Sequence, residues 1–597
     1  MSIGILDIII IILFALLMLG IGLYYRRYSN RNVSSYFLGG RKLPWWLAGI
    51  SMVATTFAAD TPLAVAELVH KGGIAGNWLW WNFLAGGMLT TFFFSRLWRK
   101  AKILTDLEFI ELRYSGKPAA FLRAFKAIYL GIFMNALIIG WVNLALLTII
   151  QVFFNTTYQE AFVYLAIAMV VVAVYSSISG LMGVTVTDFL QFFIAMGGTT
   201  LLAYYVLRGP EIGGISGLVE KLPDATFSFF PSIADDATVG SFTGSLTLSV
   251  GAFLAFIGLQ WWSSWYPGAD PGGGGYIAQR MMSAKNEQHA IAATLFFQIM
   301  HYCVRPWPWI LVGLATIILY PELEGSEKRL GYVMAMRDYL PAGLKGVLLI
   351  AFFSAYMSTL SSQLNWGASY LVNDLYKRFI DRDAGPKKLV KVSQVSTIIM
   401  MLVALLFTPF MRSIAEVWLF TIEFGAGLGL VLILRWYWWR INAWSEITAT
   451  IVPFIVYLVG RFYFHLTFPN SFFVTMIVTT VAWIVVTYCT APTDMDVLKK
   501  FYARVEPSGA WRPVRELLGI RGRQGKIKSL ILCWISSIAM TYGILFLIGY
   551  VIFSQWNNAF VMLSVISGSF VILAYHSKKI NIFGDEKEQA NTETEVD

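Results

Sequence analysis

The chain has 597 residues, of which 57% are hydrophobic and only 13% are charged, and its mean hydropathy is +0.64. A soluble domain carries roughly 25% charged residues, so this composition excludes an ordinary soluble protein and indicates a chain that crosses a membrane many times. The three cysteines, Cys303, Cys489 and Cys533, all lie in apolar stretches, which argues against a disulfide framework or a cysteine metal cluster.

Each membrane-spanning helix needs about 20 apolar residues, and the sequence contains fifteen stretches of this kind. Taken in chain order, the expected spans cover 3–25, 45–69, 76–97, 122–152, 160–179, 184–207, 242–283, 288–320, 343–376, 391–411, 414–438, 446–464, 470–490, 528–553 and 557–576. The predicted fold class is therefore an all-α polytopic membrane protein.

Most of the 45 Lys and Arg residues fall in the loops on one side of these spans, if the N-terminus is placed outside. The positive-inside rule assigns that side to the cytoplasm. We therefore expect an extracellular or periplasmic N-terminus, a cytoplasmic C-terminal tail and a location in the plasma or inner membrane. The net charge of +10 then reflects topology and does not indicate binding to nucleic acid.

The second span contains residues that disfavour a continuous helix. Pro62 removes a backbone donor and disfavours helix at Thr61, and a break here would free carbonyls such as those of Ala54 and Phe57. Broken helices at mid-membrane form ion and solute sites in many secondary transporters. Asp60 is a functional candidate because an ionisable residue inside the membrane is costly. A simple proline kink is the plainer alternative.

Asp188 lies near the inner start of the span at 184–207. It could cap the start of that helix, or it could be a second carboxylate that faces the path of an ion. The seventh span is broken as well, since residues 261–275 contain two prolines and a run of glycines that no continuous helix accommodates. Two broken spans that lie five apart indicate a five-plus-five inverted repeat with sites at the breaks.

A stripe of hydroxyl groups runs along the ninth span. Ser354, Ser358, Ser361 and Ser362 have the spacing of residues on one face of a helix, and Thr359 lies one residue round from Ser358. Such a stripe can let two membrane helices pack closely. It can also offer oxygen ligands to a hard cation such as Na⁺, which prefers oxygen as other hard ions do.

Five sequence motifs, in this order, resemble those of the sodium:solute symporter family. They are the segment 36–46, the break at 54–61, Thr187 with Asp188, the segment 278–280 with 283–286, and the segment 358–365. The resemblance covers about residues 5–440. It implies a LeuT-type inverted repeat that works by alternating access, with one extra span before the repeats and about four after them. It divides the chain into 1–43 (first span and loop), 44–208 (first repeat), 209–241 (extracellular loop), 242–440 (second repeat), 441–576 (accessory spans) and 577–597 (disordered cytoplasmic tail).

The resemblance also implies where Na⁺ binds. The main site would use the backbone carbonyls of Ala54, Phe57 and Ala355 and the hydroxyls of Ser358 and Thr359. Some members of the family have a second sodium site, whose counterparts here would be Asp188, Ser358, Ser361 and Ser362. This sequence has an oxygen side chain at all four of those positions.

The family places its solute between the two broken helices and the spans that begin near Leu122 and Ile414. The candidates at those positions are Asp60, Thr61, Asn135, Trp261, Trp262 and Glu423. The galactose symporters of the family have Glu-Gln where this chain has Asp60-Thr61, which argues against copying their sugar contacts. Arg305 is the one basic residue in mid-span. It could pair with Asp60, Asp270 or Glu423, or it could receive an anionic solute.

The expected function is inward transport of a small polar organic solute, sugars included, with Na⁺ as the co-transported ion. The alternatives are a Na⁺-coupled amino acid or carboxylate symporter of the same fold and, from another class, an ion-conducting channel. An enzyme is not expected, because no cluster of His, Cys and Asp has the spacing of a metal site. The expected partners are the lipid bilayer and a small-molecule solute, without nucleic acid, for a monomer or weak oligomer.

Overall fold

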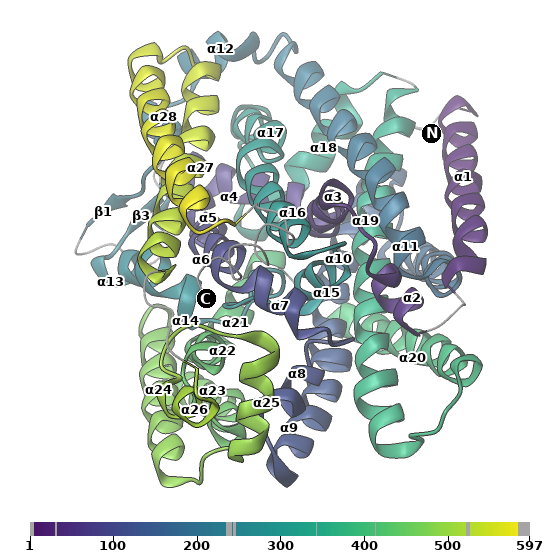
Figure 1. The fold of residues 1–597 in the computed structure, drawn as a ribbon. Coiled ribbons are helices and arrows are strands. Elements are labelled where there is room, and N and C mark those ends of the chain that lie inside the picture. The colour runs from purple at the N-terminus through teal and green to yellow at the C-terminus, as the bar shows by residue number, and fades with distance from the viewer. Residues whose placement is uncertain are drawn as a thin grey trace.

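The computed structural model describes residues 5–29, 33–234, 241–242, 246–341, 343–411, 413–520 and 526–582. Within these residues the protein is almost entirely helical, with one small three-stranded sheet (Figure 1). Ten of the described helices are long and apolar enough to cross a membrane, and the bent pair of α3 (Trp45–Phe57) and α4 (Asp60–Gly72) adds an eleventh span. The expected all-α polytopic fold is thus observed.

Of the other four expected spans, the first is one continuous helix, α1 (Ile5–Ser29). The expected spans 76–97, 242–283 and 414–438 each consist of several helical pieces. A continuous apolar run in the sequence therefore overstates the number of uninterrupted helices. Glycines lie at the breaks within 242–283 and 414–438, and they interrupt a helix while leaving the apolar character of the run intact.

The N-terminal half runs from the first span to a long kinked helix. Its other helices are α1 (Ile5–Ser29), α2 (Val33–Leu38), α5 (Trp78–Trp81), α6 (Leu84–Leu89), α7 (Ser95–Ala101), α8 (Glu108–Arg113), α9 (Gly116–Ile128), α10 (Asn135–Phe154) and α11 (Tyr158–Leu207). Helix α11 has a kink at Gly180, whose φ of 58° and ψ of −177° are not helical. Glycine adopts this conformation without steric cost, so the chain crosses the membrane twice, as 158–176 and 180–207.

A loop region with little helix separates the two halves. It contains α12 (Gly214–Lys221) and three short strands, β1 (Ser232–Ile233), β2 (Ser241–Phe242) and β3 (Leu246–Leu248). The strands lie in the order β1-β3-β2, and β3 pairs in parallel with β1 and antiparallel with β2.

The second half repeats the pattern of a broken span followed by long helices. Its helices are α13 (Val250–Phe253), α14 (Gln260–Ser263), α15 (Gly275–Ser283), α16 (Glu287–Ile299), α17 (Trp307–Leu319), α18 (Leu330–Tyr339), α19 (Leu344–Ser369), α20 (Pro386–Phe407), α21 (Ile414–Phe424) and α22 (Gly429–Tyr437). The chain is not helical between α14 and α15, so the expected second break is observed. In the centre of the molecule α3 packs against α11, α16 and α19, and α11 also packs against α19.

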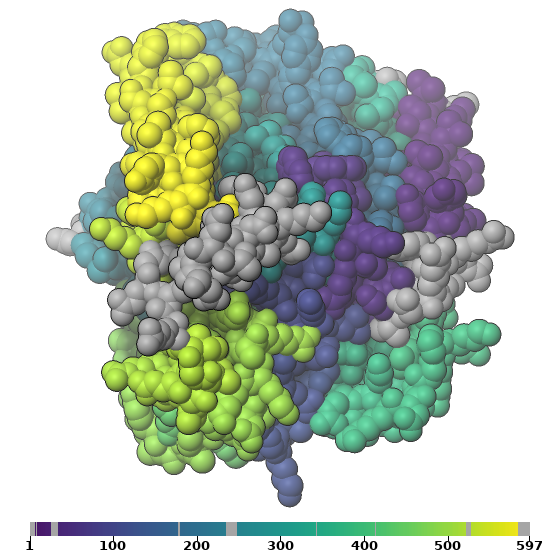
Figure 2. All heavy atoms as spheres, viewed as in Figure 1, coloured from purple at the N-terminus to yellow at the C-terminus, as the bar shows by residue number. Residues whose placement is uncertain are grey.

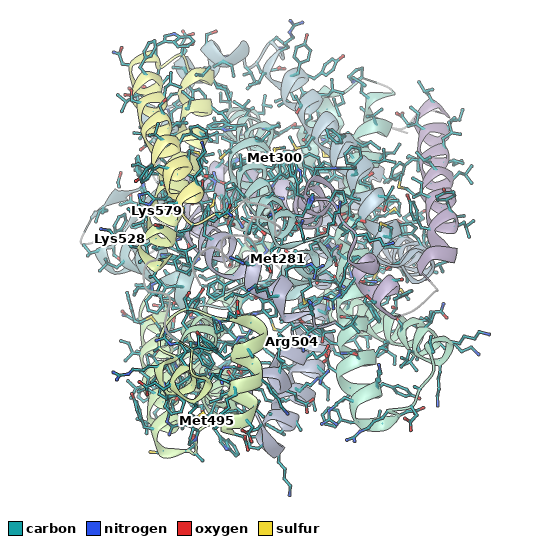
Figure 3. All side chains as sticks on the ribbon, in the orientation of Figure 1. Met281, Met300, Met495, Arg504, Lys528 and Lys579 are labelled. Carbon is teal, nitrogen blue, oxygen red and sulfur yellow. The ribbon has the colours of Figure 1, made fainter. Side chains whose placement is uncertain are left out.

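The C-terminal helices form two groups at the periphery (Figures 1 and 2). They are α23 (Ala443–Phe462), α24 (Asn470–Cys489), α25 (Met495–Val505), α26 (Arg512–Leu518), α27 (Lys526–Ile552) and α28 (Trp556–Lys579). Helices α27 and α28 pack side by side, and Lys528 and Lys579 lie at the same end of the pair (Figure 3). The expected tail at 577–597 lies outside the described residues from 583 onward.

The first span is attached to the centre of the molecule. Helix α1 packs against α11 and α19, and the buried Asp7 accepts a hydrogen bond of 2.6 Å from the backbone N–H of Gly346. This N–H belongs to the first turn of α19, whose donors have no partner within the helix. A carboxylate from a neighbouring helix therefore caps the helix that carries the hydroxyl stripe.

Candidate functional site

The break in the second span lies at Ala58 and Ala59. Helix α3 ends at Phe57, and α4 begins at Asp60 with its axis turned by 59°. Ala58 has a φ of 36°, which is uncommon for a residue with a side chain. Pro62 lies in the first turn of α4, where its missing N–H breaks no helical bond. The simple proline kink is therefore wrong, because the proline starts a new helix.

The last turn of α3 offers carbonyl oxygens at this break. The final four carbonyls of a helix have no partner within it, and in α3 these belong to residues 54–57. Thr55 O accepts a hydrogen bond of 2.7 Å from Thr359 Oγ1 of α19, and Thr56 O accepts one of 3.3 Å from Thr61 Oγ1. The carbonyls of Ala54 and Phe57 accept no such hydrogen bond in the described residues, so they remain for another ligand.

The hydroxyl stripe of α19 lies against this end of α3. All five of its hydroxyl residues are buried, as the spacing on one helix face led us to expect. Besides the bond from Thr359, Ser362 Oγ lies 2.9 Å from Thr55 Oγ1. Ser361 Oγ donates to Ser358 O in its own helix at 3.1 Å. Ser354 Oγ is buried without a hydrogen-bond partner in the described part of the chain.

Asp188 lies inside α11 and is fully buried. Its two carboxylate oxygens accept hydrogen bonds from Ser358 Oγ at 2.6 Å and from Ser51 Oγ at 2.5 Å. The alternative that Asp188 caps the start of a helix is therefore wrong. Ser358 uses its only proton in the bond to Asp188, which leaves the lone pairs of its oxygen available to a cation.

A buried arginine lies beside the same carboxylate. Arg280 Nη2 is 3.9 Å from Asp188 Oδ2 and donates to Ser362 Oγ at 2.6 Å. Its Nε donates to Ser51 Oγ at 3.2 Å. Arg280 lies near the end of the expected span 242–283 and is fully buried. Together, Arg280, Ser51 and Ser362 connect α15, α3 and α19 around Asp188.

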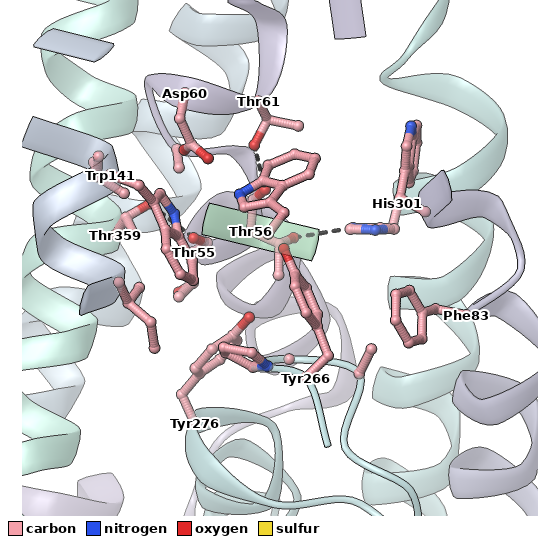
Figure 4. A pocket seen from close by; sticks show the side chains of 18 of the residues that line it. Thr55, Thr56, Asp60, Thr61, Phe83, Trp141, Tyr266, Tyr276, His301 and Thr359 are labelled. Carbon is pink, nitrogen blue, oxygen red and sulfur yellow. Dashed lines mark hydrogen bonds between the residues drawn. The ribbon is translucent and has the colours of Figure 1, made fainter. Parts of the chain in front are cut away.

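A cavity of about 90 Å³ lies next to the end of α3, between the two broken spans. Its walls carry Asp60 and Thr61 on one side and Tyr266 and Tyr276 on the opposite side, with Trp141 and His301 between them (Figure 4). One water needs roughly 10–15 Å³ on this scale, so the cavity has room for about six to nine waters. That space suits a small solute.

Arg305 lies in the wall of this cavity and is almost fully buried. Its Nη1 donates to Val53 O at 3.3 Å and to Thr56 Oγ1 at 3.0 Å, and its Nε donates to His301 O at 3.2 Å. In the described residues no carboxylate lies within ion-pair distance of its guanidinium. The predicted pairing of Arg305 with Asp60, Asp270 or Glu423 is therefore not observed.

The other predicted solute residues lie outside the cavity wall. Asn135 Nδ2 donates to Gln363 O at 3.1 Å, Trp261 packs against Trp534 with ring centres 5.6 Å apart, and Trp262 Nε1 donates to Gly258 O. The carboxylate of Glu423 accepts a hydrogen bond from Ser471 Oγ of α24. Of the predicted solute residues, the structure brings together Asp60, Thr61 and Arg305.

A family model for "Sodium:solute symporter family" matches residues 36–452. The chain belongs to the sodium:solute symporter family. It is therefore a multi-pass membrane transporter that couples solute uptake to Na⁺, and it is not an enzyme.

Several known proteins are similar to this symporter. A sodium/glucose cotransporter of Vibrio parahaemolyticus is 27% identical over 485 residues, which cover 76% of this chain and 84% of the relative. Sodium/glucose cotransporter 2 of Rattus norvegicus is 25% identical, with 68% of this chain and 63% of the relative covered. The solved structure of a Na⁺-coupled sialic acid symporter superimposes with a TM-score of 0.66 at 20% identity, covering 82% of this chain and 99% of that one. The fold of the symporter is thus of the LeuT type.

Sequence reasoning missed much of the cavity wall of this symporter. The side chains of Trp80, Trp141, Trp418 and His301 line it, and they come from helices far apart in the sequence. The chain has 22 Trp, so their positions alone do not distinguish a cavity wall from lipid-facing surface. His301 had a usable signal, because it lies one helical turn before Arg305, and residues four apart lie on the same face.

Proposed function

We propose that this symporter couples inward movement of Na⁺ to uptake of a small polar organic solute by alternating access in the cell membrane. One observation carries the proposal: the Thr359 hydroxyl of α19 donates to a terminal carbonyl of α3, directly beside a cavity with two buried charges. Carbonyl and hydroxyl oxygens at a broken helix are ligands suited to Na⁺. A solute in the adjoining cavity and the ion would then both contact the last turn of α3.

The main sodium site would be formed by the carbonyls of Ala54, Phe57 and Ala355 and the hydroxyls of Ser358 and Thr359. The geometry of α3 supports this assignment, since its last turn meets the hydroxyl stripe at Thr55 O and also contains the carbonyls of Ala54 and Phe57. Ser358 supports it too, because its proton goes to Asp188 and its oxygen lone pairs are left for the ion. The site has no net charge of its own, so it would bind Na⁺ weakly enough to release it to the cytoplasm.

The second sodium site would use Asp188, Ser358, Ser361 and Ser362. The guanidinium of Arg280 now holds Ser362 Oγ and lies near Asp188. An ion that enters this site would take over oxygens that Arg280 holds. We therefore propose that Na⁺ at the second site and Arg280 compete for Asp188. This competition lowers the affinity of the second site for Na⁺ below that of a site whose carboxylate has no cationic neighbour.

Two classes of solute fit the proposal. The similar proteins that are named sodium/glucose cotransporters favour a sugar. The aspartate and arginine in the cavity wall favour a charged solute, because neither has a counter-ion among the described residues. A channel is disfavoured by the two broken helices, because helices broken at an ion site fit coupled transport better than a continuous pore.

The test is counterflow into proteoliposomes that contain the purified full chain. Vesicles are loaded with unlabelled candidate solutes, and uptake of the labelled solute is followed with Na⁺ or with K⁺ outside. We expect exchange of labelled for unlabelled solute that requires Na⁺. Flux that proceeds without exchange would identify a channel, and exchange that does not depend on Na⁺ would refute coupling to this ion.

A further inference from the structure

The cavity contains two opposite charges that have no ionic partner in the described residues. Asp60 is 2% exposed and Arg305 is 1% exposed, and both line the same space. Asp60 lies in the first turn of α4, on the side of the cavity opposite Tyr266 and Tyr276 (Figure 4). The two groups are not within ion-pair distance of each other.

Within the part of the chain that the structure describes, neither group forms a hydrogen bond or an ion pair with an opposite charge. The guanidinium of Arg305 there donates to the neutral acceptors Val53 O, Thr56 Oγ1 and His301 O, and its Nη2 lies 3.3 Å from His301 Nε2. The contacts of Arg305 fix the position of its guanidinium. The Oδ1 atom of Asp60 is buried, has no hydrogen-bond partner in the described residues and is available to a solute.

Burying an unpaired charge is costly. The penalty is still several kcal/mol per ion after the protein relaxes, and an ionisable group inside the membrane is retained chiefly for function. A neutral sugar would give both groups hydrogen bonds but would neutralise neither. An anionic solute would leave Asp60 without a counter-ion, and a cationic solute would do the same to Arg305.

We propose that the transported solute is a zwitterion, in which an amino or quaternary ammonium group meets Asp60 and a carboxylate meets Arg305. This proposal rests on the proposed function, since it names the solute class of the same cavity. The aromatic walls fit it, because the faces of Trp80, Trp141 and Tyr266 attract a cationic group as well as apolar carbon. Space for about six to nine waters matches a solute of amino-acid size.

The first test compares matched solutes by thermal stabilisation of the purified full chain, in Na⁺ and in K⁺ buffer. The panel contains the standard amino acids and betaine, their N-acetylated and amidated forms where these exist, and glucose and galactose. We expect at least one zwitterion to stabilise the protein in Na⁺ only. Its N-acetylated form, which has lost the cation, and its amide, which has lost the anion, should each bind at least tenfold more weakly.

The second test removes one charge at a time. Asp60→Asn should abolish the preference for the zwitterion over its N-acetylated form, and Arg305→Gln should abolish the preference over the amide. Because each variant should lose a different one of the two preferences, the result distinguishes an effect on solute recognition from a general effect on folding. The control is Glu67→Gln, which neutralises a buried carboxylate of the same helix that pairs with Lys71 and lies outside the cavity wall. It should leave both preferences unchanged.

The outcomes separate this inference from the proposed function. Na⁺-dependent stabilisation and counterflow by a sugar, without any response to a zwitterion, would overturn the zwitterion and leave Na⁺-coupled symport intact. A zwitterion whose blocked forms bind equally well would also overturn the inference. Na⁺-independent binding together with absence of counterflow for every solute would refute the proposed function itself.

Discussion

Thr359 provides the sharpest test of the main sodium site. Its Oγ1 donates to Thr55 O at 2.7 Å, and in the proposed site the same oxygen is a ligand of Na⁺. Thr359→Ala removes this ligand while keeping a small residue at a close contact between helices. If the ligand contributes about 1.5–3 kcal/mol, as a hydrogen bond to a charged group does, the affinity for Na⁺ falls roughly tenfold to a hundredfold, since about 1.4 kcal/mol is a factor of ten.

The assay is a Na⁺ titration of solute uptake in proteoliposomes, with the half-saturating Na⁺ concentration as the readout. Thr359→Ser keeps the hydroxyl and should retain most of the affinity. A matched control is Thr397→Ala in α20, because Thr397 is buried and its hydroxyl, among the described residues, bonds to Ser393 O of its own helix alone, at 3.0 Å. An unchanged half-saturating concentration in Thr359→Ala, in protein of normal thermal stability, would remove Thr359 from the site.

Three further predictions follow from other contacts. Asp188→Asn should reduce the steepness of uptake against Na⁺ concentration, and a Hill coefficient close to one in the unmodified protein would instead indicate a single sodium site. Cysteines introduced at Ser2 and Glu588 should be labelled from opposite sides of the membrane, as the distribution of Lys and Arg predicts, and labelling from one side would refute the expected topology. Asp7→Ala should lower the free energy of unfolding by about 0.5–2 kcal/mol, the usual cost of a lost helix cap, because Gly346 loses its acceptor. That variant should keep its Na⁺ affinity, and an unchanged melting temperature would contradict the capping role.

The sequence was sufficient to predict the features that depend on the local preferences of the backbone and on helical periodicity. The break before Pro62, the second break at 261–275 and the buried stripe on α19 each follow from backbone preferences or from helical periodicity, and each is observed. The number of uninterrupted spans was not predictable in this way. Hydropathy measures apolar content over a window, and a helix can end inside such a window without any change in that content.

Features that depend on tertiary contacts were beyond the sequence. Arg280 lies near the end of the expected span 242–283, and its sequence position did not indicate that it is fully buried beside Asp188. Position along a span does not determine which way a long side chain turns. Lys126 and Arg435 are similar cases, since both are buried and paired with Glu446. Trp261 and Trp262 were selected for their place in the broken span, but Trp261 packs against Trp534 of α27 and neither side chain lines the cavity.

Adjacent residues at the end of α3 give a physical route for coupling. Thr55 contacts the ion side, through Thr359 and Ser362 of α19. Its neighbour Thr56 contacts the solute side, because its Oγ1 accepts from Arg305 and lies 3.1 Å from His301 Nδ1. Both residues belong to the same final turn, so an ion that fixes the terminal carbonyls also fixes the group that positions Arg305. Coupling of this kind is reciprocal: the solute must raise the affinity for Na⁺ by the factor by which Na⁺ raises the affinity for the solute.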